Sequence, residues 1–279
     1  MDTNHPLSLP EIVLIIGKFI PLWVPEQHED EMPWSFQPKD LLAAISVNRL
    51  FNTVLTPLLF TVYVEPFPEL PNNTASVAIY TLPSTFHIRF LDLSRYLPHC
   101  SGKLDPAQLN CTRLQELRLS SYVDTTCARQ LIQANPGLRV LAWESCHEIL
   151  PEEAFLDLKS ALSLNQLRYL GLHSWKLAIT CLYDILRHNA EHLEEVRLED
   201  CDSFVSQATK QSVSLSAPLP MAKTLQLDVD DNELPQSIYD LVPHLPALET
   251  IVVSELREST AKELGETLRK YCPNLRTIK

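Results

Sequence analysis

From Ile88 onward, the apolar residues of this chain recur in one spacing: apolar, two variable positions, apolar, one variable position, apolar. Eight segments follow this spacing, and their first residues lie 24 to 29 residues apart. Those first residues are Ile88, Leu114, Leu138, Leu167, Leu193, Ala222, Leu248 and Leu275. A period of this length is typical of stacked units that bury their apolar faces against one another. We therefore predict an α/β solenoid across residues 88–279, built on a ladder of short parallel strands.

The segments between these strands predict helical returns on the outside of the ladder. Apolar residues recur with helical spacing at Thr126–Ala134, Pro151–Leu164, Ile179–Ala190 and Thr260–Tyr271. The return at residues 203–221 is rich in Ser and Pro, which favours a loop over a helix.

Residues 5–64 have a different pattern, which predicts three short helices. The first opens at Pro10, a residue suited to the first turn, and Pro21 ends it. Asp40 is a suitable N-cap for the second helix, and the third runs from Phe51 to Phe60. Residues 61–64 alternate as a first strand would. A helical unit of this size is marginally stable alone and needs a neighbour or a partner.

These patterns divide the chain into three parts. Residues 5–64 form the helical domain, residues 65–87 a proline-rich connector with four prolines, and residues 88–279 the solenoid.

Charge and composition exclude several classes of partner. The formal net charge of −12 is divided equally, with −6 before Ile88 and −6 from Ile88 onward, so neither part carries the basic surface that binds nucleic acid. No stretch approaches the ~20 apolar residues of a membrane helix, and the short run Ile12–Ile16 follows Glu11 rather than the basic residues of a signal peptide. The seven cysteines include no C-x-x-C pair, which is typical of a reducing compartment. We expect a cytoplasmic or nuclear protein that binds neither nucleic acid nor a membrane.

The periodic segment resembles the cysteine-containing leucine-rich repeats, whose units begin L-x-x-L-x-L-x-x-N/C. In that family the position eight residues after the start points inward. Here Tyr96, Tyr122, Cys146, Trp175, Cys201, Asp230 and Leu256 occupy it.

The N-terminal segment resembles an F-box, the helical motif that joins substrate receptors to cullin–RING ubiquitin ligases. The matching residues are Leu9-Pro10-Glu11, the run Ile12–Ile16, Ile20-Pro21, Asp40-Leu41-Leu42, Val47-Asn48-Arg49-Leu50-Phe51 and Leu59-Phe60. Phe51 and Phe60 stand where the family often has tryptophan, and residues 22–39 form an insertion. The resemblance implies that an apolar face binds the linker subunit of the ligase, with Leu9, Pro10, Ile12, Leu41, Leu42, Val47 and Phe51 as its contacts. The alternative is that these residues are the core of the three-helix unit.

On the repeats, the variable residues between the inward aliphatics should line the concave face, because successive strand residues point to opposite faces. The expected target-binding residues there are Glu116, Arg118, Glu144, Tyr169, His173, Glu195, Arg197, Glu199 and Gln226. The alternative is a solvated strand face without a ligand. Tyr and Arg are frequent anchors of protein interfaces, which favours a protein target.

The sequence offers little for catalysis. It contains no G-x-S-x-G and no H-E-x-x-H, and five glycines leave little material for nucleotide-binding loops. His188 and His192 are spaced to share a helix face, and Asp228, Asp230 and Asp231 cluster after a strand, but solvated side chains explain both groups. We expect no catalytic residue, no metal and no cofactor.

Together, the two resemblances imply the non-catalytic substrate-recognition adaptor of an SCF-type cullin–RING ubiquitin ligase, with an unidentified protein as its target. The alternative is a leucine-rich-repeat scaffold for protein interactions without a connection to a ligase. A third possibility, a repeat-built enzyme, has the least support from the sequence.

Overall fold

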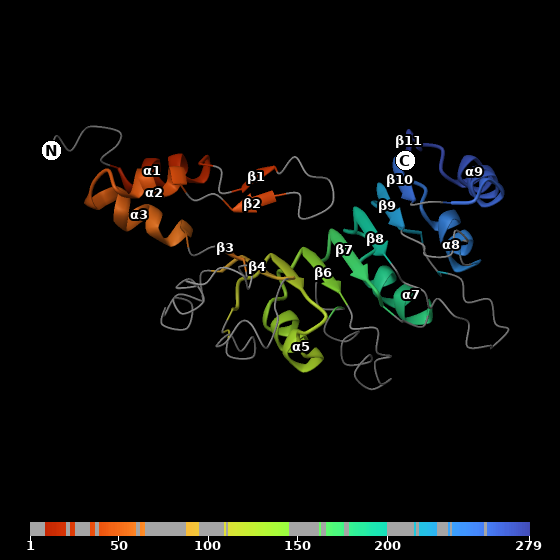
Figure 1. Ribbon diagram of the computed structural model, residues 1–279, viewed down its shortest axis with the longest axis horizontal. Helices are drawn as coiled ribbons and strands as arrows, with labels where there is room; N and C mark the ends of the chain where they lie inside the picture. The colour runs from red at the N-terminus through yellow and green to blue at the C-terminus, as the bar shows by residue number, and fades with distance from the viewer. Residues whose placement is uncertain are drawn as a thin grey trace.

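A computed structural model shows an α/β protein with one parallel sheet and a separate group of helices at its N-terminal end (Figure 1). The structure describes residues 9–20, 23–25, 34–36, 39–59, 62–64, 88–94, 109, 111–144, 162, 166–175, 179–199, 215, 218–227, 234, 236–253 and 256–279.

The parallel sheet has nine strands, and their order in space is their order in the chain, from β3 to β11. The strands are β3 (Val62–Val64), β4 (Phe90–Leu93), β5 (Glu116–Leu119), β6 (Val140–Glu144), β7 (Tyr169–His173), β8 (Glu195–Glu199), β9 (Thr224–Leu227), β10 (Thr250–Val253) and β11 (Thr277–Ile278). Each strand pairs in parallel with the preceding one, so that Leu117, Leu141 and Leu170, for example, lie side by side across three strands. Equivalent positions of successive units therefore form rows across the sheet.

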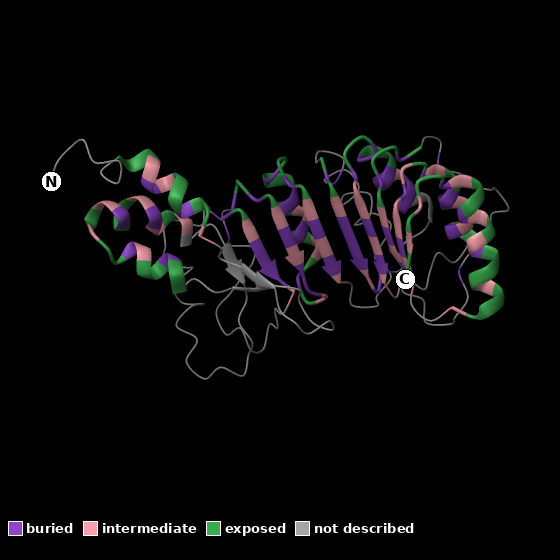
Figure 2. Ribbon diagram, turned by 90° about the horizontal axis from the view of Figure 1, so that it is seen from above, coloured by how far each residue is buried: buried purple, intermediate pink, exposed green. Residues whose placement is uncertain are grey.

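The two faces of the sheet differ because the strand residues alternate. In β5, β6 and β8, one residue in two is fully buried and the next is half-buried. The buried aliphatics join the helices in one continuous core, which includes Leu91, Leu117, Leu141, Leu170 and Val196. Figure 2 shows the half-buried residues as bands along the other face, which no described helix covers. We call this uncovered side the open face.

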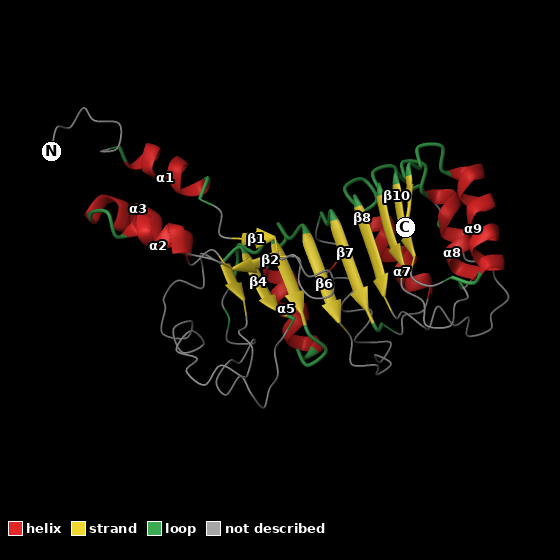
Figure 3. Cartoon of the chain, turned by 45° about the horizontal axis from the view of Figure 1, so that its top comes forward, coloured by secondary structure: helices red, strands yellow, loops and turns green. Residues whose placement is uncertain are grey.

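The described helices of the sheet region are α5 (Thr125–Ala134), α7 (Ile179–His188), α8 (Gln236–Leu241) with the short 3-10 helix η4 (Val242–His244), and α9 (Glu258–Tyr271). They lie on the side opposite the open face (Figure 3). Helix α5 begins at the N-cap Asp124, whose carboxylate accepts a hydrogen bond from Thr126 N at 2.8 Å. Leu131 and Ile132 of α5 and Leu264 and Leu268 of α9 are buried against the core.

Two buried asparagines fix the corners between helix and strand. Asn135 Oδ1 accepts a hydrogen bond from Leu114 N at 2.6 Å, and its Nδ2 donates to the carbonyls of Cys111 and Leu131. Asn189 makes the equivalent bond to Leu167 N at 2.9 Å and also donates to Ile185 O. Each asparagine thus links the end of its helix to the backbone just before the preceding strand and satisfies buried groups that would otherwise lack partners.

The N-terminal helices are α1 (Pro10–Lys18), α2 (Lys39–Ile45) and α3 (Arg49–Leu59), and they share a second, small core. That core consists of Val13, Leu41, Ile45, Phe51 and Leu55. The side chain of Asn48 caps α3 by accepting a hydrogen bond from Phe51 N at 3.0 Å. Gly17 lets α1 approach α3, because a Cβ atom there would overlap Leu55 Cδ2 and lie 2.8 Å from Leu58 Cδ1.

The insertion between α1 and α2 contains two short antiparallel strands, β1 (Trp23–Pro25) and β2 (Trp34–Phe36). The prolines of this insertion are tolerated because a two-stranded ribbon has only edges.

Most of the predicted elements are present. All eight predicted strands are confirmed, each beginning two residues after the first apolar residue of its segment. Strand β3 confirms the alternation at residues 61–64, although it pairs with β4 and so joins the sheet rather than the helical unit. Most of the predicted helix Pro151–Leu164 lies outside the described residues. Helix α8 was not predicted.

In one repeat, the residue eight positions after the start does not point inward as expected. Tyr122 is 57% exposed, because the chain turns immediately after β5 before reaching α5. Trp175 is buried as expected, and Leu256 packs against the core. Tyr96, Cys146, Cys201 and Asp230 lie outside the described residues. Among the helices that the structure describes, none is long and apolar enough to cross a membrane.

Candidate binding surfaces

All nine residues predicted to bind a target lie half-buried on the open face. Parallel registration brings them into three rows. The first row carries Glu116, Tyr169 and Glu195, the second Arg118, Arg197 and Gln226, and the third Glu144, His173 and Glu199. Residues from five strands, far apart in the sequence, therefore form one continuous surface.

A hollow of about 340 Å³ lies in the middle of the open face. The second row passes through it, and in this row Arg118 on β5 and Arg197 on β8 flank Ala142 and Gly171 on the strands between them. Two of the smallest side chains thus stand next to each other between longer ones. The sequence predicts these positions on the concave face but not the hollow, which follows from the register that aligns Ala142 with Gly171.

Tyr169 forms one wall of the hollow. Its side chain extends along β7 over Gly171, where a Cβ atom would lie 2.8 Å from the Tyr169 hydroxyl. Burial, with a smaller effect of the Glu195 charge, raises the pKa of Tyr169, and Arg197 and Arg118 only partly oppose this rise. The phenol therefore stays protonated at neutral pH and offers a hydroxyl group to the hollow.

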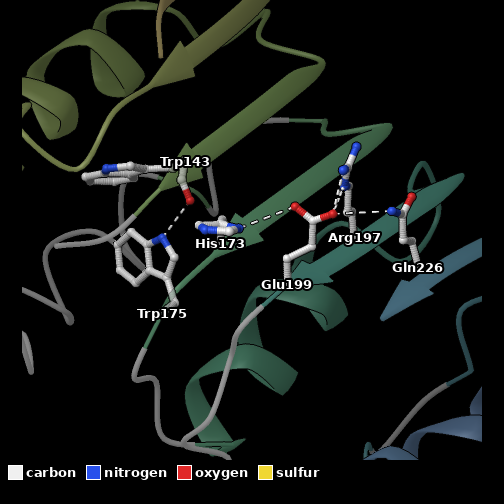
Figure 4. A network of polar contacts seen from close by, with 6 residues as sticks. All are labelled: Trp143, His173, Trp175, Arg197, Glu199 and Gln226. Atoms are coloured by element: carbon white, nitrogen blue, oxygen red, sulfur yellow. Dashed lines mark hydrogen bonds and ion pairs between the residues drawn. The ribbon is translucent and has the colours of Figure 1, made fainter. Parts of the chain in front are cut away.

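Glu199 is the centre of a polar network at one side of the hollow (Figure 4). Its Oε1 accepts hydrogen bonds from Arg197 Nε at 2.6 Å and from Gln226 Nε2 at 3.3 Å. Its Oε2 lies 3.4 Å from His173 Nδ1. Three side chains from three strands therefore converge on one carboxylate.

The electrostatics of this network hold Glu199 and Arg197 in their charged forms. Burial acts to raise the pKa of Glu199, but hydrogen bonds and charges from His173 and Arg197 outweigh burial, and the pKa lies below its usual value. Burial acts to lower the pKa of Arg197, but Glu199, with a smaller effect of Tyr169, leaves it raised. The two side chains thus neutralise each other.

Hydrogen bonds and aromatic packing fix the end of β7 beside the network. Ser174 follows His173 with a φ of 56°, a left-handed conformation uncommon for a residue with a side chain, and its N–H donates to Glu199 O at 2.8 Å. This turn sends Trp175 inward, where its Nε1 donates to Trp143 O at 2.8 Å and the two rings meet edge to face at 4.8 Å (Figure 4). The backbone that positions His173 is therefore fixed by its neighbours.

The residues predicted to bind a linker subunit divide into two groups. Leu41 and Phe51 are buried in the core of the helical unit, as the alternative of core packing predicts. Leu9 and Leu42 are each 47% exposed and Val47 is 64% exposed, whereas Pro10 is exposed and Ile12 is partly buried.

Sequence analysis missed three exposed apolar residues of α1 and its C-cap. Ile15 is 50% exposed, Ile16 is 37% exposed and Phe19 is 82% exposed. The signal was present in the sequence, because nearly all residues of Ile12–Phe19 are apolar and a helix in a small bundle buries only one of its sides. We call Leu9, Ile15, Ile16, Phe19, Leu42 and Val47 the apolar patch.

The described residues contain no group of three side chains able to hold a metal ion. His188 Nδ1 contacts Asp184 O at 2.7 Å within its own helix turn. Asp228, Asp230 and Asp231 lie outside the described residues.

No protein-family profile matches the chain, and no curated protein is significantly similar to it in sequence.

Proposed function

We propose that this protein is the substrate-recognition adaptor of an SCF-type cullin–RING ubiquitin ligase, with an F-box-like helical unit and a leucine-rich-repeat solenoid. The helical unit binds the linker subunit through the apolar patch. The open face of the solenoid holds the target protein. The observation that carries the proposal is the coexistence, in one chain, of an exposed apolar patch on a three-helix unit and a polar, hollowed sheet face.

The apolar patch supports the first half of the proposal. Soluble proteins rarely leave several large aliphatic and aromatic residues exposed on one small unit without a partner. Phe19, at 82% exposure, has the form of an interface anchor, and the adjacent Ile15 and Ile16 extend the surface around it. Burying these residues on a partner would also stabilise a unit whose described core holds five buried side chains.

The open face supports the second half. Around a hollow it combines an aromatic residue and two arginines, which are residue types enriched at protein interfaces, with the carboxylates of Glu144 and Glu199. In this proposal the contribution of the chain to ubiquitin transfer is proximity rather than chemistry. Binding adaptor and target together raises the effective concentration of target lysines beside the activated ubiquitin.

Co-purification with the linker subunit tests the proposal. The native chain should form a stable complex, and Leu9→Ala/Pro10→Ala should weaken it by more than about tenfold, as should Phe19→Ser. Met221→Ala is the matched control, because Met221 is an exposed apolar residue of the sheet region at 41% exposure and its truncation should leave the complex intact.

Circular dichroism must show that each variant remains folded. A folded, soluble native chain that forms no complex would overturn the ligase assignment and leave the non-ligase scaffold.

A further inference from the structure

We infer that the hollow of the open face binds a single lysine or arginine side chain, presented by an extended basic segment of the target protein. The inference deepens the proposed function and rests on it only for the identity of the bound protein as a ubiquitination target. It follows from the shape of the hollow and from the distribution of charge around it.

The shape suits a long, unbranched side chain. Ala142 leaves the floor of the hollow with only a methyl group, and the Tyr169 ring, which lies over Gly171, provides an aromatic wall beside it. Lysine and arginine bury their aliphatic stems against such surfaces and keep their charged ends at polar groups. A branched or short side chain would leave the floor uncovered.

The charge of the open face as a whole favours a cation. Its described residues include four glutamates, Glu116, Glu144, Glu195 and Glu199, against Arg118 and Arg197; of these glutamates, Glu144 and Glu199 line the hollow, whereas Glu116 and Glu195 lie beside it in the first row. Arg197 and Glu199 satisfy each other through hydrogen bonds, so their charges cancel. Glu144 lies in register with His173 at the rim of the hollow and supplies a carboxylate for the incoming cation.

Two further carboxylates of the open face lack full solvation. Burial raises the pKa of both Glu116 and Glu195, and Arg118 and Arg197 only partly oppose this effect. A cation brought to this face would restore favourable interactions that burial has removed. Binding of a basic segment therefore improves the electrostatics of the face itself.

The same arrangement disfavours an anionic segment. Arg197 is already hydrogen-bonded to Glu199, and the guanidinium of Arg118 lies 5.5 Å from the centre of the Phe90 ring. A phosphate or carboxylate between them would also meet Glu144 and Glu199. The overall net charge of −12 adds long-range attraction for a basic partner.

Selection from a random heptapeptide display library on the full-length protein tests this inference. Retained peptides should be enriched in Lys or Arg at one position by about tenfold or more. Synthetic versions with acetyl-lysine, norleucine or glutamate at that position should bind at least about tenfold more weakly, as measured by fluorescence anisotropy.

Three variants locate the binding. Glu144→Gln removes the carboxylate and Ala142→Leu fills the floor, and each should abolish the enrichment in a chain that keeps its native circular dichroism. Glu266→Gln is the matched control, because it makes the same charge change on exposed helix α9 and should retain it. Loss of basic preference, preference for acidic peptides, or equal effects of Glu144→Gln and Glu266→Gln would overturn the inference.

The outcome is separable from that of the linker experiment. Glu144→Gln and Ala142→Leu should leave linker binding unchanged, since the apolar patch lies on the helical unit. Peptide selection without linker binding would support the basic-segment site and reject the ligase. Linker binding without enrichment of basic peptides would support the ligase assignment and reject the basic-segment site.

Discussion

Single polar side chains inside this protein determine how its units join. Asn135 is only 1% exposed, yet it bonds three backbone groups, two of them just before β5. Asn189, at the end of α7, bonds Leu167 N just before β7 in the same way. An asparagine suits the position because its amide accepts at one atom and donates at the other.

Replacing Asn135 by Ala should lower the free energy of unfolding by about 2–4 kcal/mol, because buried backbone groups at Leu114 and Cys111 would lose their partners. Urea unfolding followed by circular dichroism measures the change. Asn274→Ala is the control, since exposed Asn274 makes one bond to Pro246 O and its loss should change stability by less than about 1 kcal/mol. Equal effects of the two substitutions would contradict the role of Asn135.

At the residue scale, Glu199 makes the stability of the protein depend on pH. The pKa of Glu199 lies below the ordinary value of 4.5 in the folded protein, so its stabilising contribution is present above pH 4.5 and is lost as pH falls through the folded pKa. Glu199→Gln should therefore destabilise the protein by about 1–2 kcal/mol at pH 7, and the difference from the native chain should shrink toward pH 3. Urea unfolding at several pH values measures this difference.

Glu194→Gln is the control for that experiment. Glu194 forms an ion pair with Arg168 at 3.4 Å, and both side chains are largely exposed. Its replacement should change stability by less than about 1 kcal/mol. A constant effect of Glu199→Gln across the pH range would show that the charge of Glu199 contributes nothing.

At the scale of elements, the sequence predicts strands better than helices and says least about surfaces. All eight strands from Phe90 onward were predictable, because the fixed spacing records the aliphatics that each unit buries. Helix α8 was not, since its six residues hold too few apolar positions to show a period. The hollow depends on Ala142 and Gly171 standing side by side, which a register between strands 29 residues apart determines. The division of the helical unit into core and patch likewise follows from how its helices pack.

The contact between α1 and α3 can be tested at Gly17. Gly17→Val should destabilise the helical unit by about 1–3 kcal/mol, because the added methyl groups would displace fully buried Leu55 and partly buried Leu58. Hydrogen exchange of α1 and α3 should accelerate while that of the sheet stays unchanged. Gly265→Val on α9 is the control, since nothing lies within 4 Å of a Cβ atom there. Similar acceleration by both variants would contradict close packing at Gly17.

At the scale of the whole molecule, the described residues form two separate cores, one in the helical unit and one under the sheet. Each has its own set of buried residues, so we expect two thermal transitions rather than one. Leu55→Ala should lower the midpoint of one and Leu170→Ala that of the other, each by the equivalent of about 2–5 kcal/mol. Calorimetry measures both, and a single transition shifted by both substitutions would show that the cores unfold together.

The order of the strands has a consequence for synthesis on the ribosome. Every strand of the sheet pairs with the one before it, 24 to 29 residues upstream, so its partner has already left the exit tunnel when it emerges. Short separations keep the entropy of loop closure low, and the growing sheet offers each new strand a formed edge. Nascent chains halted after β6, β8 and β10 should therefore show progressively longer protease-resistant fragments that end at the last emerged unit.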